Sequence, residues 1–190
     1  MNIDNCENFQ NKYRIKSARL QSWNYGWESS YFVTVCTKNR INYFGNINDG
    51  KMEKSEIGEI VSEEWLKTAN IRPDMNLSLH QFVIMPNHFH AIIHIGKNKY
   101  NNYDGNDNRR DAMHCVSTVN EFKPQSKNLS SIMRGFKSAV TKQAHCLGFD
   151  FAWQTRFHEH IIRNEKSFNR ISQYVIDNPK LWDKDKFWNK

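Results

Sequence analysis

Two strand-like runs separated by only two residues constrain the fold of this chain more than any other feature. The runs Leu77 to Met85 and His88 to Ile95 are rich in apolar and β-branched residues, and Pro86-Asn87 joins them. Such a short connection favours an antiparallel hairpin. The chain is therefore expected to contain an antiparallel sheet around which its other elements pack.

Further strand and helix patterns lie on both sides of this hairpin. The runs 31–37 and 157–163 read as strands, and the passage 45–50 is rich in turn residues. Apolar residues at helical spacing predict helices over about 53–70, from Leu129 onward with Asn128 or Ser130 as its cap, and over about 167–177. This order predicts an α+β fold of the ferredoxin-like or palm type, with an antiparallel sheet, helices packed on one face and a C-terminal helix.

The length of 190 residues predicts one domain over residues 1–190, with its core at about 14–182. The stretch 96–127 is polar and rich in asparagine near its start, which is typical of a mobile loop. No apolar run approaches the roughly 20 residues of a membrane helix, and the N-terminus does not resemble a secretory signal. These two observations lead us to expect a cytoplasmic location. Because the four cysteines form no CxxC pair, we expect reduced thiols.

The charge balance favours a polyanionic partner. Lysine and arginine number 27 against 20 acidic residues, a net charge of +7, and aromatic residues make up 13% of the chain. Basic side chains bind phosphates, and aromatic rings stack on unpaired bases. Most of these cations would be solvated surface charges in any protein. The clusters that we single out as candidate DNA contacts are Arg14, Lys16, Arg19, Lys38, Arg40, Arg134 and Lys137.

The pair His88 and His90 opens the second strand of the hairpin. Residues two apart on a strand point to the same face, so the two imidazoles would converge as a metal clamp. A simple two-residue turn would place His80 on the reverse face. The pair His158 and His160 has the same spacing on another predicted strand, and spacing alone does not rank the two pairs.

The last predicted helix carries a second candidate pair. Tyr174 and Asn178 are four residues apart and share one helical face, so a hydroxyl and an amide oxygen could meet the clamp. Tyrosine is a weak nucleophile unless a metal or a base assists it. The same residues also fit a tyrosine packed in an apolar stripe and a helix stop before Pro179.

Four blocks together resemble the REP-associated tyrosine transposases, within the single-tyrosine HUH transposases that act on single-stranded DNA. They are YFVTVCTKNRINYFG (31–45), HQFVIMPNHFHAIIHI (80–95), LSSIMRGFKSAVTKQ (129–143) and WQTRFHEHIIRNEKSFNRISQYVIDNP (153–179). The resemblance implies that His88 and His90 are metal ligands and that Tyr174 is the nucleophile. It also implies that Asn178 is the third ligand, at a position where related insertion-sequence transposases often carry glutamine. The pair at 158 and 160 then lies outside the ligand set, although His160 could support the site.

The implied activity is metal-dependent cleavage and strand transfer on single-stranded DNA that contains a REP-like hairpin. The expected products are a 5′-phosphotyrosine and a free 3′-hydroxyl. The family implies Mg²⁺ or Mn²⁺, and imidazole ligands by themselves favour Mn²⁺. A monomer and a homodimer are both compatible with the sequence. The alternative is a catalytically idle hairpin-binding protein; a zinc hydrolase would need an acidic base near the histidine pair.

Overall fold

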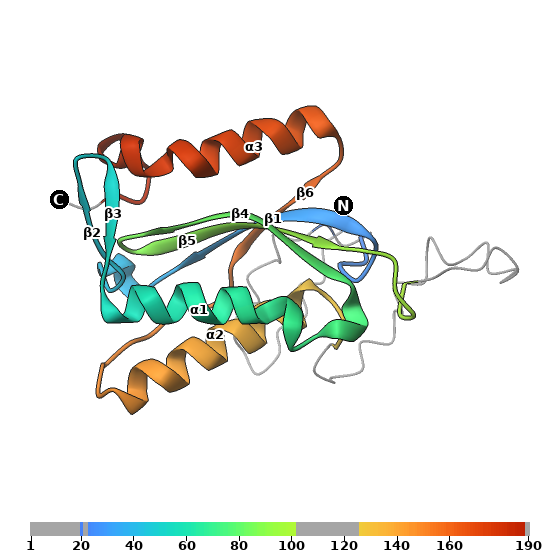
Figure 1. Ribbon diagram of the computed structural model, residues 1–190, viewed down its shortest axis with the longest axis horizontal. Coiled ribbons are helices and arrows are strands. Elements are labelled where there is room, and N and C mark those ends of the chain that lie inside the picture. The colour runs from blue at the N-terminus through green and yellow to red at the C-terminus, as the bar shows by residue number, and fades with distance from the viewer. Residues whose placement is uncertain (1–19, 21–22, 102–125, 189–190) are drawn as a thin grey trace, which may run out of the picture.

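The described part of the chain is built around a four-stranded antiparallel sheet. A computed structural model describes residues 20, 23–101 and 126–188. The strand order is β4-β5-β1-β6 (Figure 1). The strands are β1 (Ser29–Cys36), β4 (Leu77–Met85), β5 (His88–Ile95) and β6 (His158–Ile162). Strands far apart in sequence thus lie side by side: β1 lies between β5 and β6, and β4 and β6 are the edge strands.

The hairpin predicted from Pro86-Asn87 is confirmed, with the predicted boundaries. Met85 pairs with His88, and Val83 pairs with His90. The turn is further held by Asn87, whose backbone carbonyl accepts a hydrogen bond from the Thr37 N–H at 2.9 Å. The end of β1 is therefore tied to the turn that opens β5.

Helices cover both faces of the sheet. Helices α1 (Glu56–Asn70) and α2 (Leu129–Cys146) lie under one face, and α3 (Glu165–Asp177) lies over the other (Figure 1). The predicted α+β fold is confirmed: α1 and α2 share one face, and the other face is covered by the C-terminal helix α3. Its stripe of Ile171 and Val175 packs on Ile92 and Ile162, because these two strand residues project away from the main core.

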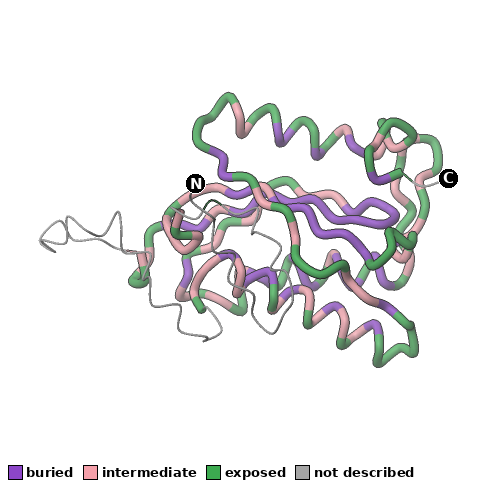
Figure 2. The backbone as a smooth tube through the Cα atoms, turned by 180° about the vertical axis from the view of Figure 1, so that it is seen from behind, coloured by how far each residue is buried: buried purple, intermediate pink, exposed green. Residues whose placement is uncertain are grey.

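The main core lies between the sheet and the two helices α1 and α2. Figure 2 shows the sheet as the most continuously buried part of the chain. Phe89 is fully buried, with its ring centroid 5.0 Å from that of Trp65 in α1 and 5.3 Å from that of Phe136 in α2. Such packing fixes the hairpin against two helices at once.

Each helix begins at a polar cap. Ser55 accepts a hydrogen bond from the Gly58 N–H ahead of α1, and Asn128 forms a reciprocal capping box with Ser131 at α2, as the sequence allowed. Asn164 accepts from the Ser167 N–H, so α3 begins slightly earlier than predicted. At its other end α3 passes into the 3-10 segment η4 (Asn178–Lys184).

A small second hairpin is the main element absent from the predictions. Strands β2 (Gly45–Asn48) and β3 (Lys51–Lys54) pair through a turn at Asp49 and Gly50, both with positive φ. Positive φ at both turn residues is the geometry that two-residue hairpins favour. The passage was recognised as turn-rich, but its strands are too short and too polar for an alternating pattern to reveal them.

A β-bulge in β4 changes the expected position of His80. The register slips between Leu79 and Phe82, so His80 and its neighbour together oppose one residue of β5. The His80 ring meets Phe168 of α3 edge-on, with centroids 5.0 Å apart. His80 therefore lies on the α3 face with His88, and the prediction that it lies on the reverse face is wrong.

Several predictions fall outside the described residues. These include Arg14, Lys16 and Arg19, and most of the polar stretch 96–127, of which residues 102–125 are not described. The single-domain organisation stays a prediction. Among the described residues, no helix has both the length and the apolar character needed to cross a membrane, and Cys36 and Cys146 are free thiols.

Candidate metal and tyrosine site

His88 and His90 converge on the α3 face of the sheet, as the alternation of β5 predicted. Their ring centroids lie 4.5 Å apart, and their exposed fractions are 0% and 1%. Burial is the largest cause that lowers the pKa of both rings, to about 3 for His90 and well below the usual range for His88. Both imidazoles are therefore neutral near pH 7 and carry free lone pairs.

A hydrogen bond from the turn sets the tautomer of His88. The amide nitrogen of Asn87 donates to the carbonyls of Arg40 and Phe187, at 3.2 and 2.8 Å, so its Oδ1 is the atom that faces His88. That oxygen lies 3.0 Å from His88 Nδ1 and can only accept, which puts the ring proton on Nδ1. The Nε2 atom of His88 is left as a buried lone pair, with no hydrogen-bond partner in the part of the chain that the structure describes.

His90 is held between strand β1 and helix α3. Its Nδ1 lies 2.8 Å from the Thr34 hydroxyl, which comes from the residue paired with it on β1. Its Nε2 lies 3.3 Å from the hydroxyl of Tyr174. A ring oriented through one nitrogen while the other faces the site is the usual arrangement of a metal-ligating histidine.

Helix α3 brings Tyr174 to His90, as predicted, and Asn178, the first residue of η4, forms a hydrogen bond with Tyr174. Tyr174 is 40% exposed, and its ring stands edge-on to Phe32 of β1 with centroids 6.1 Å apart. Burial is the main cause that raises the pKa of Tyr174, with a further rise from Asp185, whereas a hydrogen bond with Asn178 lowers it. The tyrosine is thus not packed in the apolar stripe of α3, because Ile171 and Val175 form that stripe.

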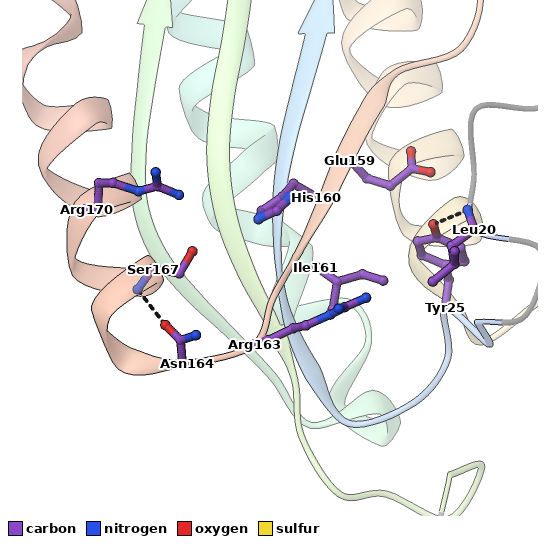
Figure 3. Close-up of a pocket in the computed structure, with 9 residues that line it drawn as sticks. All are labelled: Leu20, Tyr25, Glu159, His160, Ile161, Arg163, Asn164, Ser167 and Arg170. Atoms are coloured by element: carbon purple, nitrogen blue, oxygen red, sulfur yellow. Dashed lines mark hydrogen bonds between the residues drawn. The ribbon is translucent and has the colours of Figure 1, made fainter.

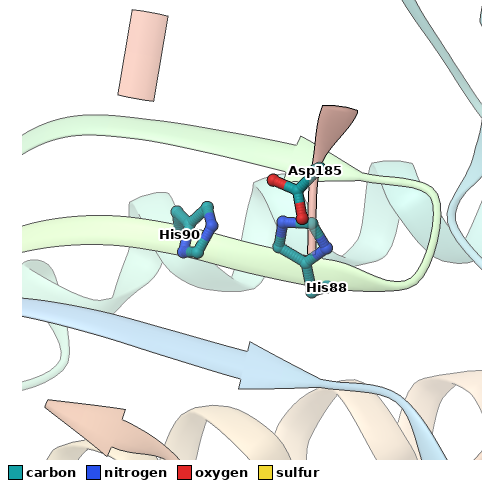
Figure 4. A group of neighbouring side chains, drawn as sticks. All are labelled: His88, His90 and Asp185. Carbon is teal, nitrogen blue, oxygen red and sulfur yellow. The ribbon is translucent and has the colours of Figure 1, made fainter. Parts of the chain in front are cut away.

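Asp185 is a site residue that the sequence did not reveal. One carboxylate oxygen and one ring nitrogen each from His88 and His90 all lie within 4.8 Å of one another (Figure 4). Asp185 follows η4, which turns the chain back over the hairpin. Its position depends on this return path, and the polar sequence around it has no spacing that points to a ligand.

The same C-terminal segment covers His88. The Phe187 ring lies 4.6 Å from the His88 ring, and Trp182 lies on it at 5.9 Å, measured between centroids. Arg40 stacks over Phe187 at 5.2 Å and donates to the Lys186 carbonyl at 3.1 Å. The complete burial of His88 is therefore due in part to residues at the far end of the chain.

The donor set fits a divalent cation. His88 Nε2 and Asn178 Oδ1 are buried without a hydrogen-bond partner among the described residues. Leaving such atoms unpaired costs about 1–3 kcal/mol each, and a bound cation would remove that cost. Two imidazoles with amide and carboxylate oxygens suit Mn²⁺ better than Mg²⁺, which prefers oxygen alone.

The second histidine pair lies apart from this group. His158 pairs with Thr34 on the other edge of β1, so one strand separates it from His90. At about 4.8 Å per strand, the two backbones are about 10 Å apart. Both His158 and His160 are exposed, and neither joins the His88, His90 and Asp185 group.

The candidate DNA contacts separate into two places. Lys38 and Arg40 form the 3-10 segment η1 (Lys38–Arg40) beside the C-terminal cover of the site. Arg134 and Lys137 belong to α2, under the opposite face of the sheet, where Lys137 donates to the carbonyls of Gln154 and Arg156 at 2.7 and 3.1 Å.

Comparison with known proteins gives two sequence relatives of interest, whereas no protein-family model matches the chain. An uncharacterized protein of Haemophilus influenzae is 36% identical over 174 residues, which are 91% of this chain and 92% of that protein. A REP-associated tyrosine transposase of Escherichia coli K12 is 30% identical over 116 residues, 60% of this chain and 65% of that protein. The chain thus matches slightly less than two thirds of the length of the Escherichia coli protein.

A solved structure of the REP-associated tyrosine transposase bound to a REP hairpin has the same fold. The TM-score is 0.54 at 19% sequence identity, and the match covers 87% of this chain and 73% of that one. The shared architecture comprises the antiparallel sheet, the helices and the C-terminal helix. Fold and sequence relative agree: the chain is similar in sequence to a REP-associated tyrosine transposase and shares the fold of one.

Proposed function

We propose that this protein cleaves and rejoins single-stranded DNA that carries a REP-like hairpin, with Tyr174 as the nucleophile. The observation that carries the proposal is the 3.3 Å distance between the Tyr174 hydroxyl and His90 Nε2, next to the two unpaired atoms His88 Nε2 and Asn178 Oδ1. The hairpin specificity is suggested by the related structure, which holds a REP hairpin.

His88, His90 and Asn178 would hold a divalent cation, with Asp185 as a further oxygen donor. When bound, the cation would polarise the scissile phosphodiester and offset negative charge on the leaving oxygen. Thr34 and Asn87 orient the two imidazoles through their Nδ1 atoms, so both Nε2 atoms face the site.

In the proposed reaction the Tyr174 oxygen attacks phosphorus as its proton is lost. The bond between phosphorus and the 3′ oxygen breaks, and that oxygen leaves as a 3′-hydroxyl after taking up a proton. The 5′-phosphotyrosine keeps the energy of the phosphodiester, so attack by a 3′-hydroxyl reverses the step without another energy source. Phe32 supports the nucleophile by standing against its ring.

The test is a covalent adduct. Labelled hairpin oligonucleotides with randomised single-stranded flanks are incubated with the protein and Mn²⁺, and adducts are resolved by denaturing electrophoresis. We expect an adduct with wild type and none with Tyr174→Phe, which loses only a hydroxyl. Tyr100→Phe is the matched control, because Tyr100 is 43% exposed and lies outside the site.

Peptide mapping of the adduct identifies the tyrosine that carries the DNA. An adduct on a tyrosine other than Tyr174 would overturn the assignment of the nucleophile. Hairpin binding by wild type without any adduct would point instead to a hairpin-binding protein that does not cleave.

A further inference from the structure

A pocket of about 450 Å³ lies around the end of β6, between the first half of α3 on one side and Leu20 and Tyr25 on the other (Figure 3). Its lining includes His160 of β6 and Arg163, the residue that follows β6. From α3 it includes Ser167 and Arg170. The volume is in the range of small-ligand sites. Nothing in the proposed cleavage chemistry uses these residues.

The pocket carries two arginines without acidic partners. Arg163 and Arg170 are exposed, and within the described residues neither guanidinium forms an ion pair or a hydrogen bond. Figure 3 shows the Arg170 side chain directed from α3 toward His160 on β6. Glu159 also lines the pocket but points away from Arg170, as the alternation of β6 requires.

The arginine on α3 is aligned with the nucleophile. Ser167, Arg170 and Tyr174 are spaced three and four residues apart, so they lie along one side of the helix. At 1.5 Å per residue, Arg170 is about 6 Å and Ser167 about 10 Å along the axis from Tyr174. His160 pairs with Phe32, and the Phe32 ring touches Tyr174, so the strand side of the pocket is also adjacent to the proposed nucleophile.

We propose that this pocket holds the sugar-phosphate backbone of the single-stranded DNA segment that adjoins the scissile phosphate. Arg170 binds a phosphate through its planar fork of donors. Arg163 points to the Ile161 side of β6, so it binds a phosphate farther along the strand, where the strand passes the edge of β6. Ser167 and His160 add hydrogen-bonding groups between them. The proposal rests on the proposed function for the identity of the substrate, and it adds positioning residues that the histidine and tyrosine groups do not supply.

A phosphodiester strand is the ligand that this chemistry favours. The pocket is open and carries two arginines, and its lining on α3 ends at Arg170, about one helical turn before Tyr174, so an extended anion can reach from the pocket to the tyrosine. Phosphate contacts of this kind position a strand without reading its sequence. The single-stranded flank, and not the hairpin stem, is therefore the part expected to occupy the pocket.

Equilibrium binding in EDTA tests the proposal without cleavage. Fluorescence anisotropy is measured for Arg170→Ala and for the double variant Arg163→Ala/Arg170→Ala with two probes, a hairpin with single-stranded flanks and the same hairpin with blunt ends. Each titration is repeated over a series of salt concentrations. Lys166→Ala is the matched control, because Lys166 lies one turn before Arg170 on α3, is exposed and does not line the pocket.

For the flanked probe we expect Arg170→Ala to weaken binding by about fivefold. The slope of log affinity against log salt should become shallower by about 0.7 in the single variant and by about 1.4 in the double variant. The blunt hairpin should bind all variants equally, and Lys166→Ala should keep the wild-type slope. An unchanged slope in the double variant, or an equal loss on the blunt hairpin, would overturn the proposal.

Failure of this proposal can be told apart from failure of the proposed function. If the arginine variants bind like wild type while the wild type still forms an adduct, the pocket assignment alone is wrong. If the flanked probe loses affinity as expected but wild type forms no adduct, the pocket binds DNA and the cleavage chemistry is wrong.

Discussion

Strand β5 presents two different surfaces, and their difference separates stability from chemistry. Toward α1 and α2 it presents Phe89, Ala91, Ile93 and Ile95, all fully buried in the main core. Toward α3 the same strand presents the buried His88 and His90, Ile92, which packs on α3, and His94. Alternation by one residue therefore divides the strand between a packing face and the face that carries the proposed site, which we call the reactive face.

Burial alone does not distinguish the two faces. Phe89 and His88 both have an exposed fraction of 0%. The difference lies in what burial does to each side chain. Burial of a phenylalanine side chain stabilises the folded state, because apolar surface leaves water. Burial of an imidazole favours its neutral form, whose nitrogen lone pair needs a partner. The unpaired Nε2 of His88 marks the reactive face.

Removal of an imidazole from the reactive face should give the largest effect. His90→Ala takes away a proposed ligand and the atom nearest the Tyr174 hydroxyl, so we expect Mn²⁺ affinity and cleavage to fall by more than about a hundredfold. Isothermal titration calorimetry measures the Mn²⁺ affinity, and the adduct assay measures cleavage. His158→Ala should keep the wild-type Mn²⁺ affinity, and an equal loss in both variants would show that the wrong histidine pair was chosen.

The corresponding change on the packing face is Phe89→Ala. It leaves a cavity between Trp65 and Phe136, and the free energy of unfolding should fall by about 3–5 kcal/mol. Urea denaturation followed by fluorescence measures this. Phe149→Ala is the control: Phe149 is 36% exposed, so its removal should lower the free energy of unfolding much less. Similar losses for the two would mean that Phe89 does not carry the core.

Acid should lower the free energy of unfolding through His90 on the reactive face, because the packing face has no group that titrates. The pKa of His90 is lowered to about 3, with burial as the main cause and the Lys186 charge as a second. Below the ordinary pKa of about 6.5, the unfolded chain therefore binds a proton that the native protein does not. Stability is lost as pH falls, by about 2 kcal/mol between pH 7 and pH 5 for this group.

Denaturation in EDTA at pH 7 and pH 5 checks the expectation. His90→Gln, which lacks the titrating group, should lose less stability over that interval than wild type, by about the same 2 kcal/mol. Equal losses would show that His90 is accessible to protons in the native state.

The smallest expected effect concerns the orientation of His90. Thr34→Val keeps the shape of the side chain but removes the hydroxyl 2.8 Å from Nδ1, so Mn²⁺ affinity should fall by about tenfold. Thr141→Val removes a hydroxyl of α2 that bonds the Lys137 carbonyl at 2.8 Å and should not change Mn²⁺ affinity. A Thr34→Val variant with wild-type affinity would make the hydroxyl irrelevant to the site.

Much of this arrangement follows from local sequence. The two-residue turn defined the hairpin register, and the register placed His88 and His90 together. The spacing of Tyr174 and Asn178 is also a local property of a helix, although their approach to the histidines was implied by the family resemblance. Patterns of this kind reach only a few residues along the chain.

What the sequence left undetermined depends on contacts that are distant along the chain. The bulge that turns His80 toward α3 has no residue signature in β4. Asp185 and Phe187 join the site because η4 leads the chain back over the hairpin. The placement of α3 on the second face rests on Ile92 and Ile162, whose partners come from a different part of the chain.

The single side chain of Asn87 makes the turn a junction between distant parts of the protein. Its two amide hydrogens point at the carbonyls of Arg40 and Phe187, and its oxygen points at His88. Exchange of that amide for a carboxylate would place negative charge against two carbonyl oxygens, turning two attractions into repulsions. The same exchange would offer His88 a charged acceptor that favours a second proton on the ring. One side chain at the tip of a hairpin thus links the docking of the C-terminal residues to the availability of a proposed metal ligand.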